Sequence, residues 1–125
     1  MTENELAKIV IDLCFKIHKT LGPGLLESVY ESALCYELDL LGIPYERQKD
    51  MPVPYRDTIL DVGFRTDVIV ESKLIVEIKS IENLLPVHHK IVITYLRIAE
   101  KKLGLLINFN VNLLKDGIFR KVNGL

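Results

Sequence analysis

The chain has 125 residues, enough for one domain with a substantial core and too few for two. Hydrophobic residues make up 49% and charged residues 26%, a balance that is typical of a folded soluble protein and excludes a disordered one. No stretch is long enough to span a bilayer, and the net charge of −1 excludes nucleic-acid binding by bulk attraction alone. We therefore expect a single domain over residues 1–125 that is not bound to a membrane.

Two features predict a cytoplasmic protein. The opening residues 2–5 are acidic and polar, unlike a secretory signal. Cys14 and Cys35 both lie in apolar helical patterns and have no Cys or His at ligand spacing. That placement favours reduced core thiols over a disulfide or a zinc site.

The first helix is predicted from its cap and its apolar spacing. Thr2 stands three residues before Glu5, which is the spacing of a capping box at a helix start. Apolar residues then recur at helical spacing as far as Ile17, so one face of this helix needs a partner surface. Gly22 and Pro23 end the helix, because proline cannot continue its ladder of hydrogen bonds.

A second helix is expected to begin near Leu25 or Leu26 and to run toward Leu41, with Gly42 just beyond it. Glu27 lies in its first turn. The helix dipole stabilises an acid at this position, which explains Glu27 without any catalysis. Glu27 also lies beside the apolar stripe, so it is a candidate to point into a cleft over the sheet.

The rest of the chain predicts several strands and one more helix. Prolines confine residues 51–55 to an edge strand or an extended segment. A third helix is expected from Pro86 until Gly104 ends the pattern. Because this helix separates two strands, it allows a crossover connection, and the element order predicts an α/β (α+β) fold with a central mixed sheet flanked by helices. The expected strands are residues 59–70, 74–81, 105–109 and 118–122.

The most informative stretch is the predicted hairpin of residues 64–79. Pairing about Ser72 places Asp67 opposite Glu77, and alternation of side chains places Lys79 on the same face as both acids. Two facing carboxylates repel each other unless a cation lies between them, and Mg²⁺ prefers carboxylate oxygens. The hairpin therefore predicts a metal site at which Lys79 holds a scissile phosphate or a nucleophilic water.

Two alternatives to this metal site stay open. An acidic pair with a lysine is often only a solvated face with a cross-strand ion pair. The pairing also depends on the turn, since a two-residue turn at Ser72 and Lys73 would shift the register by one residue. Asp67 would then lie on the face opposite Glu77.

Two motifs resemble a known family. Residues 24–30, Gly-Leu-Leu-Glu-Ser-Val-Tyr, are similar to the motif that names the GxxExxY proteins. Asp67 followed by Glu77-Ile78-Lys79 resembles the signature of the PD-(D/E)XK nuclease superfamily, to which those proteins are assigned. The resemblance covers nearly the whole chain. It implies a core of helix, three strands, helix and strand, with Mg²⁺-dependent phosphodiester hydrolysis in the active relatives.

The resemblance also implies roles for four residues. Glu27, Asp67 and Glu77 would hold Mg²⁺ or Mn²⁺, while Lys79 would orient or activate water and stabilise charge on the phosphate. The sequence departs from the family at Ile91, because relatives commonly carry a Gln there, about four residues before the Tyr-Leu of the third helix. An aliphatic side chain cannot hydrogen-bond to a phosphate, a water or a base, so either the role is dispensable or the activity is impaired.

Nucleic acid, either DNA or RNA, is the expected partner. Because the net charge is close to zero, its binding needs a local basic surface. A solubilising helix face with favourable charge at its C-terminus explains the same residues equally well. The candidates lie on or just after the third helix and are Lys90, Arg97, Lys101 and Lys102.

Two functions compete at this point. The leading one is a metal-dependent nuclease or related phosphodiesterase, because all four charged residues of the site are present. Its rival is a non-catalytic member that binds nucleic acid or a protein, which Ile91 and the near-neutral charge favour. A homodimer that pairs through the edge at residues 51–55 is compatible with either function.

Overall fold

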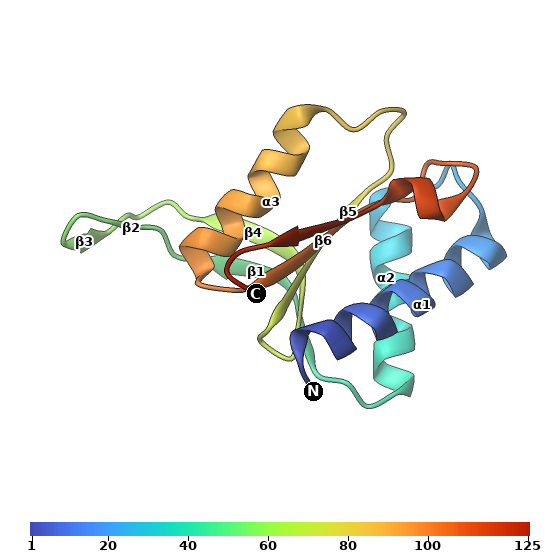
Figure 1. Cartoon of the computed structure of the whole chain (residues 1–125), viewed down its shortest axis with the longest axis horizontal. Coiled ribbons are helices and arrows are strands. Elements are labelled where there is room, and N and C mark those ends of the chain that lie inside the picture. The colour runs from blue at the N-terminus through green and yellow to red at the C-terminus, as the bar shows by residue number, and fades with distance from the viewer.

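The computed structural model describes residues 1–125 and has helices on both sides of a five-stranded sheet (Figure 1). The capping box predicted at Thr2 and Glu5 is present, with each side chain bound to the backbone N–H of the other residue. None of the helices combines the length and the apolar character needed to cross a membrane. The elements in chain order are α1 (Glu3–Leu21), α2 (Glu27–Leu40), β1 (Tyr45–Met51), β2 (Pro54–Tyr55), β3 (Thr58–Ile59), β4 (Phe64–Val70), β5 (Leu74–Lys79), α3 (Pro86–Ala99), β6 (Leu103–Asn108), the 3-10 turn η1 (Leu114–Gly117) and β7 (Ile118–Val122).

The main sheet has the strand order β1-β4-β5-β6-β7. Strands β5 and β6 are parallel, and every other neighbouring pair is antiparallel. A parallel pair needs a crossover connection, which α3 supplies. The predicted mixed sheet flanked by helices is therefore confirmed.

Helices α1 and α2 cover one face of the sheet and form the main core with it. This core holds 20 buried residues, to which β4 and β5 contribute every second side chain. At one end of the core, the ring of Tyr30 stacks on Phe109 with the ring centroids 4.3 Å apart. The Tyr30 hydroxyl donates to the carbonyl oxygen of Gly22 at 2.5 Å and thereby fixes the loop between the two helices. The core residues from β4 and β5 are Val68, Val70, Leu74, Val76 and Ile78.

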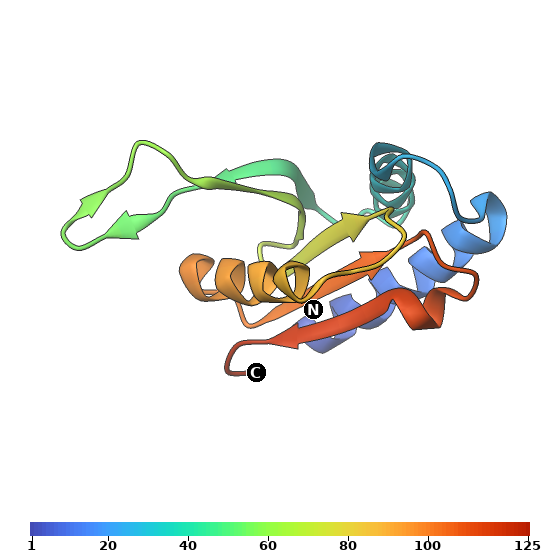
Figure 2. The ribbon, with the colours of Figure 1, turned by 90° about the horizontal axis from the view of Figure 1, so that it is seen from above.

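Helix α3 covers the opposite face, and its core is much smaller (Figure 2). Three buried residues, Ile69, Ile75 and Leu96, make up this second cluster. Gly104 of β6 lets the helix approach closely, because a Cβ there would lie 3.0 Å from Val92 Cγ1 and 3.3 Å from Leu96 Cδ2. A single helix leaves part of this face uncovered, and the predicted acids lie on this side.

Residues 52–63 form an arm that projects beyond the body of the protein (Figures 1 and 2). Its short strands β2 and β3 pair only with each other. The continuous strand predicted over residues 59–70 was therefore wrong at its start, since β4 begins at Phe64. The reason is a close crossing of the chain, where a Cβ on Gly63 would lie 2.0 Å from the carbonyl oxygen of Met51.

Candidate active site

Asp67 and Glu77 meet where β4 separates from β5. The pairing of these strands reaches Val68 with Val76, which confirms the register predicted about the turn. Beyond that pair, hydrogen bonds to the two carboxylates take the place of backbone hydrogen bonds between the strands. The Asp67 N–H donates to Glu77 Oε1 at 3.2 Å, and the Ile78 N–H donates to Asp67 Oδ2 at 2.8 Å. Each carboxylate therefore binds a backbone amide of the other strand.

Glu77 is a buried acid beside a second acid. Its side chain lies on the α3 face, and only 6% of the residue is exposed. Burial, and then the negative charge of Asp67, raise the pKa of Glu77 to about 9, against a smaller opposing effect of Lys79. The metal-free protein therefore holds a proton on Glu77 at neutral pH.

Lys79 ends β5 and lines a small hollow of about 80 Å³ together with Glu77. Its side chain is half-buried and takes part in none of the protein's ion pairs, so the amine is available to an anionic ligand. The wall of the hollow opposite β5 comes from α3 and includes His88 and Ile91. Ile91 therefore lines the hollow beside Glu77 and Lys79, at the position where the family resemblance predicted a hydrogen-bonding side chain.

Tyr95 is a site residue whose role the sequence did not reveal. Its ring stacks on Phe64 of β4, with the ring centroids 4.2 Å apart. Burial, and then the charges of Glu77 and Asp67, raise the pKa of its hydroxyl, which places that group in the field of both acids. The available signal was its spacing, because Tyr95 follows Ile91 by one helical turn and lies on the same helix face.

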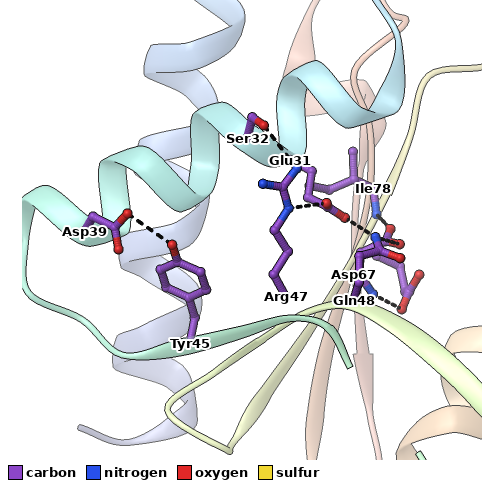
Figure 3. A network of polar contacts seen from close by, with 9 residues as sticks. Glu31, Ser32, Asp39, Tyr45, Arg47, Gln48, Asp67 and Ile78 are labelled. Carbon is purple, nitrogen blue, oxygen red and sulfur yellow. Dashed lines mark hydrogen bonds and ion pairs between the residues drawn. The ribbon is translucent and has the colours of Figure 1, made fainter. Parts of the chain in front are cut away.

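A polar network that the sequence also did not predict reaches Asp67 from α2 and β1 (Figure 3). Glu31 of α2 is 5% exposed. Its carboxylate accepts hydrogen bonds from Arg47 Nε and from Gln48 Nε2, each at 2.6 Å. The same Gln48 nitrogen donates to Asp67 Oδ1 at 3.5 Å. Gln48 therefore joins the buried acid of the helix to the acid of the strand.

Glu27 is not brought into contact with the other three predicted residues. It is exposed at the start of α2 and lines a separate hollow with Ser80 and Asn110. Ser80 directly follows Lys79, and its Oγ donates to the carbonyl oxygen of Leu25 at 2.5 Å, so this hollow adjoins the end of β5. The role of Glu27 as a metal ligand stays a prediction, and no three His, Cys, Asp or Glu side chains are grouped to hold a metal.

The predicted basic residues are distributed along α3 rather than gathered at the hollow. Lys90 lies in the first half of the helix and Arg97 in its last turn, and both are exposed. Lys101 and Lys102 follow the helix end. The α3 residues that line the hollow run from His88 to Tyr95, so this pair lies beyond the lining, past the end of the helix.

The donor set of the acidic pair fits a hard divalent cation. Asp67 and Glu77 offer carboxylate oxygens, and the pKa of Glu77 is raised by its burial and then by the negative charge of Asp67, both of which a bound cation would offset. Mg²⁺ commonly binds through one or two carboxylates and keeps several of its waters. Glu77, which lines a hollow, and the adjacent Asp67 satisfy this requirement.

The succession α2, β1, β4, β5, α3 and β6, with an acid on β4 and Glu-x-Lys on β5, forms the core that the motifs implied. Such a core with its acidic pair defines a class of nuclease-like proteins. The family profile described as the PD-(D/E)XK nuclease superfamily matches residues 4–121, and the chain belongs to this superfamily. No curated protein sequence and no solved structure gave a match.

Proposed function

We propose that the protein is a metal-dependent nuclease that hydrolyses phosphodiester bonds of nucleic acid. The observation that carries this proposal is that Glu77 contacts Asp67 on the neighbouring strand and lines a hollow with Lys79. Oxygen ligands for a cation and an unpaired amine are thereby combined beside a hollow. Membership of the nuclease superfamily supports the same conclusion.

Each residue of the site has a distinct role in this mechanism. A bound Mg²⁺ or Mn²⁺ supplies charge neutralisation at the phosphate and lowers the pKa of a coordinated water. Asp67 and Glu77 would hold the ion, and the proton on Glu77 would pass to solvent as the ion binds. Lys79 donates to a phosphate oxygen or holds the attacking water. Glu27 acts as a further acid from the adjoining hollow.

A non-catalytic binding module is the second candidate function. Ile91 favours it, because an aliphatic side chain lines the hollow where relatives carry a Gln. The two candidates differ in one observable, which is turnover. A binding module would retain oligonucleotide or protein binding without cleaving any substrate.

The deciding experiment is a cleavage panel on single- and double-stranded DNA and RNA with Mg²⁺, Mn²⁺ or a chelator. Lys79→Ala is expected to lower the cleavage rate about 100-fold or more, with little change in melting temperature, because the lysine stabilises charge in the transition state. Lys8→Ala is the matched control, since Lys8 lies on α1 and is exposed. Its rate should equal that of the wild type.

Two results would reject the proposed nuclease activity. One is cleavage that is equal in Lys79→Ala and the wild type, which would indicate a contaminating activity. The other is oligonucleotide binding by the wild type without cleavage under any of the metal conditions. The second result would establish the binding module in its place.

The substrate surface includes the exposed residues Lys90 and Arg97, with Lys101 and Lys102 extending it past the helix end. Contacts of lysine and arginine with phosphates make affinity fall with rising salt. Replacing Lys101 and Lys102 together should therefore reduce the slope of log affinity against log salt. An unchanged slope would exclude the pair from the surface.

Three narrower assignments belong to the same proposal. The chain is a GxxExxY-type member, supported by Tyr30, whose hydroxyl also accepts from the Leu25 N–H at 3.2 Å and so shapes the loop before Glu27. It is cytoplasmic, supported by the free buried thiols Cys14 and Cys35. It forms a homodimer through the edge at residues 51–55, where Tyr55 is exposed, and a monomer mass in light scattering at high concentration would contradict that assignment.

A further inference from the structure

Two neighbouring residues of β1 bind the same carboxylate, which a regular strand does not allow. Successive side chains of a strand point to opposite faces. Yet Arg47 Nε and Gln48 Nε2 both donate to Glu31, each at 2.6 Å. The cause is the backbone of Gln48, whose φ of 51° lies in the left-handed region that residues other than glycine seldom adopt.

The irregular backbone of β1 lies beside Asp67. Strand pairing between β1 and β4 joins Arg47 to Val68 and Lys49 to Thr66, and it omits Gln48. The position of β4 that this omission leaves without a partner is Asp67. A strained conformation at a polar residue is a sign of function when it delivers a side chain to a site, and here it delivers an amide to the acid.

The Gln48 amide completes the hydrogen bonding of the Asp67 carboxylate. One oxygen, Oδ2, accepts from the Ile78 N–H at 2.8 Å, and the other, Oδ1, accepts from Gln48 Nε2 at 3.5 Å. With a short contact on one oxygen and a long one on the other, rotation of the carboxylate relative to β5 is restricted. The amide is itself held by Glu31, which Arg47 holds in turn (Figure 3).

A glutamine suits this position chemically. Its amide nitrogen carries two N–H groups, enough for Glu31 and Asp67, and adds no charge. A lysine there would compete with a cation for Asp67, and a glutamate would add a third negative charge. The neutral double donor keeps two carboxylates at fixed separation without neutralising either one.

We propose that Gln48 is a positioning residue that orients the Asp67 carboxylate for metal binding, with Glu31 as its anchor. This inference rests on the proposed function, since orientation matters only if Asp67 binds a cation. Partners that orient a metal ligand typically contribute 10–100-fold to metal affinity. Gln48 does not touch the reacting atoms in this scheme, and it acts only through Asp67.

The test compares Gln48→Ala with Gln48→Gly. Both variants remove the amide, but glycine also relieves the left-handed backbone, so the pair separates the side chain from the irregular strand. Two quantities are measured: the affinity for Mn²⁺ by calorimetry, and the hydrogen exchange of the Ile78 amide in metal-free protein. Lys49→Ala is the control, because Lys49 is the exposed next residue and is paired only with Glu46.

Both Gln48 variants should bind Mn²⁺ about 10-fold more weakly or worse, and their Ile78 amide should exchange faster, while Lys49→Ala matches the wild type on both measurements. Wild-type affinity and wild-type exchange in Gln48→Gly would overturn the inference, because only the backbone would then matter. If the wild type itself binds no Mn²⁺, the proposed function fails. Hydrogen exchange of the Ile78 amide in metal-free protein then decides alone whether Gln48 positions Asp67. Faster exchange in both Gln48 variants would support that positioning, and unchanged exchange would reject it.

Discussion

The two faces of the central sheet are built from the same strands but differ in what they bury. The face under α1 and α2 belongs to a core cluster of 20 buried residues, whereas the apolar cluster of Ile69, Ile75 and Leu96 on the α3 face has three. On β5 the alternation is direct, since Val76 and Ile78 enter the large core and Glu77 between them faces the other way. The face covered by α1 and α2 supplies most of the apolar packing that stabilises the fold. The face covered by α3 alone accommodates charged side chains.

The largest expected effect on stability concerns the face covered by α1 and α2. Leu34 of α2 is fully buried there, so Leu34→Ala should lower the free energy of unfolding by about 2–5 kcal/mol, as measured by urea denaturation. Ile93→Ala on α3 is the control, because Ile93 is 44% exposed and its loss should change stability little. Equal destabilisation by the two variants would remove the proposed difference between the faces.

The next effect concerns the acidic pair Asp67 and Glu77 on the face covered by α3. A divalent cation that binds only the folded protein stabilises it by about 2.7 kcal/mol at a hundredfold excess over its dissociation constant. The wild type should therefore melt several degrees higher in Mg²⁺ or Mn²⁺ than in a salt of matched ionic strength. Asp67→Asn should lose most of this increment. An identical response of both proteins would show that the acidic pair is not a metal site.

A separate effect is expected on the pH dependence of stability without metal. Glu77 has a pKa of about 9 in the folded protein and about 4.3 when unfolded. Between these values the folded state binds more protons, so stability falls as pH rises. This contribution is complete below about pH 4.3 and is lost by about pH 9. Denaturation in a chelator should show a flatter profile for Glu77→Gln, and parallel profiles would contradict the raised pKa.

The smallest expected effect is an increase in stability. Thr66 is fully buried on β4, and its Oγ1 has no hydrogen-bond partner. Thr66→Val keeps the shape and removes the unpaired hydroxyl, so it should raise the free energy of unfolding by about 1 kcal/mol. Thr66→Ser, which keeps the hydroxyl and removes a methyl group, should not. A loss of stability in Thr66→Val would indicate that the hydroxyl has a partner.

The sequence predicted those features that depend on local patterns. Alternation along β4 and β5 gave the facing of Asp67 and Glu77, because strand geometry fixes it once the turn is known. The cap at Thr2 and the crossover through α3 followed from equally local rules. The nuclease-superfamily resemblance was also correct, since its residues match in order and spacing.

Features that depend on contacts between distant segments were missed. The left-handed backbone of Gln48 contradicts local preference, and the partners of its side chain are Glu31, 17 residues earlier in the chain, and Asp67, 19 residues later. Phe64 and Tyr95 stack across β4 and α3, which no periodicity relates. The break before β4 likewise depends on how closely Gly63 passes Met51.

The reciprocal amide contacts of Asp67 and Glu77 affect which residues of the site are retained during evolution. Each acid occupies a backbone N–H at the point where β4 leaves β5, so losing either one would leave an amide of the sheet unsatisfied. A protein with this arrangement would therefore be selected to keep both acids whether or not it hydrolyses a substrate. Lys79 forms no ion pair and has no such second duty. Among relatives with this fold, the lysine is therefore the more reliable marker of hydrolysis, and the acids can outlast it.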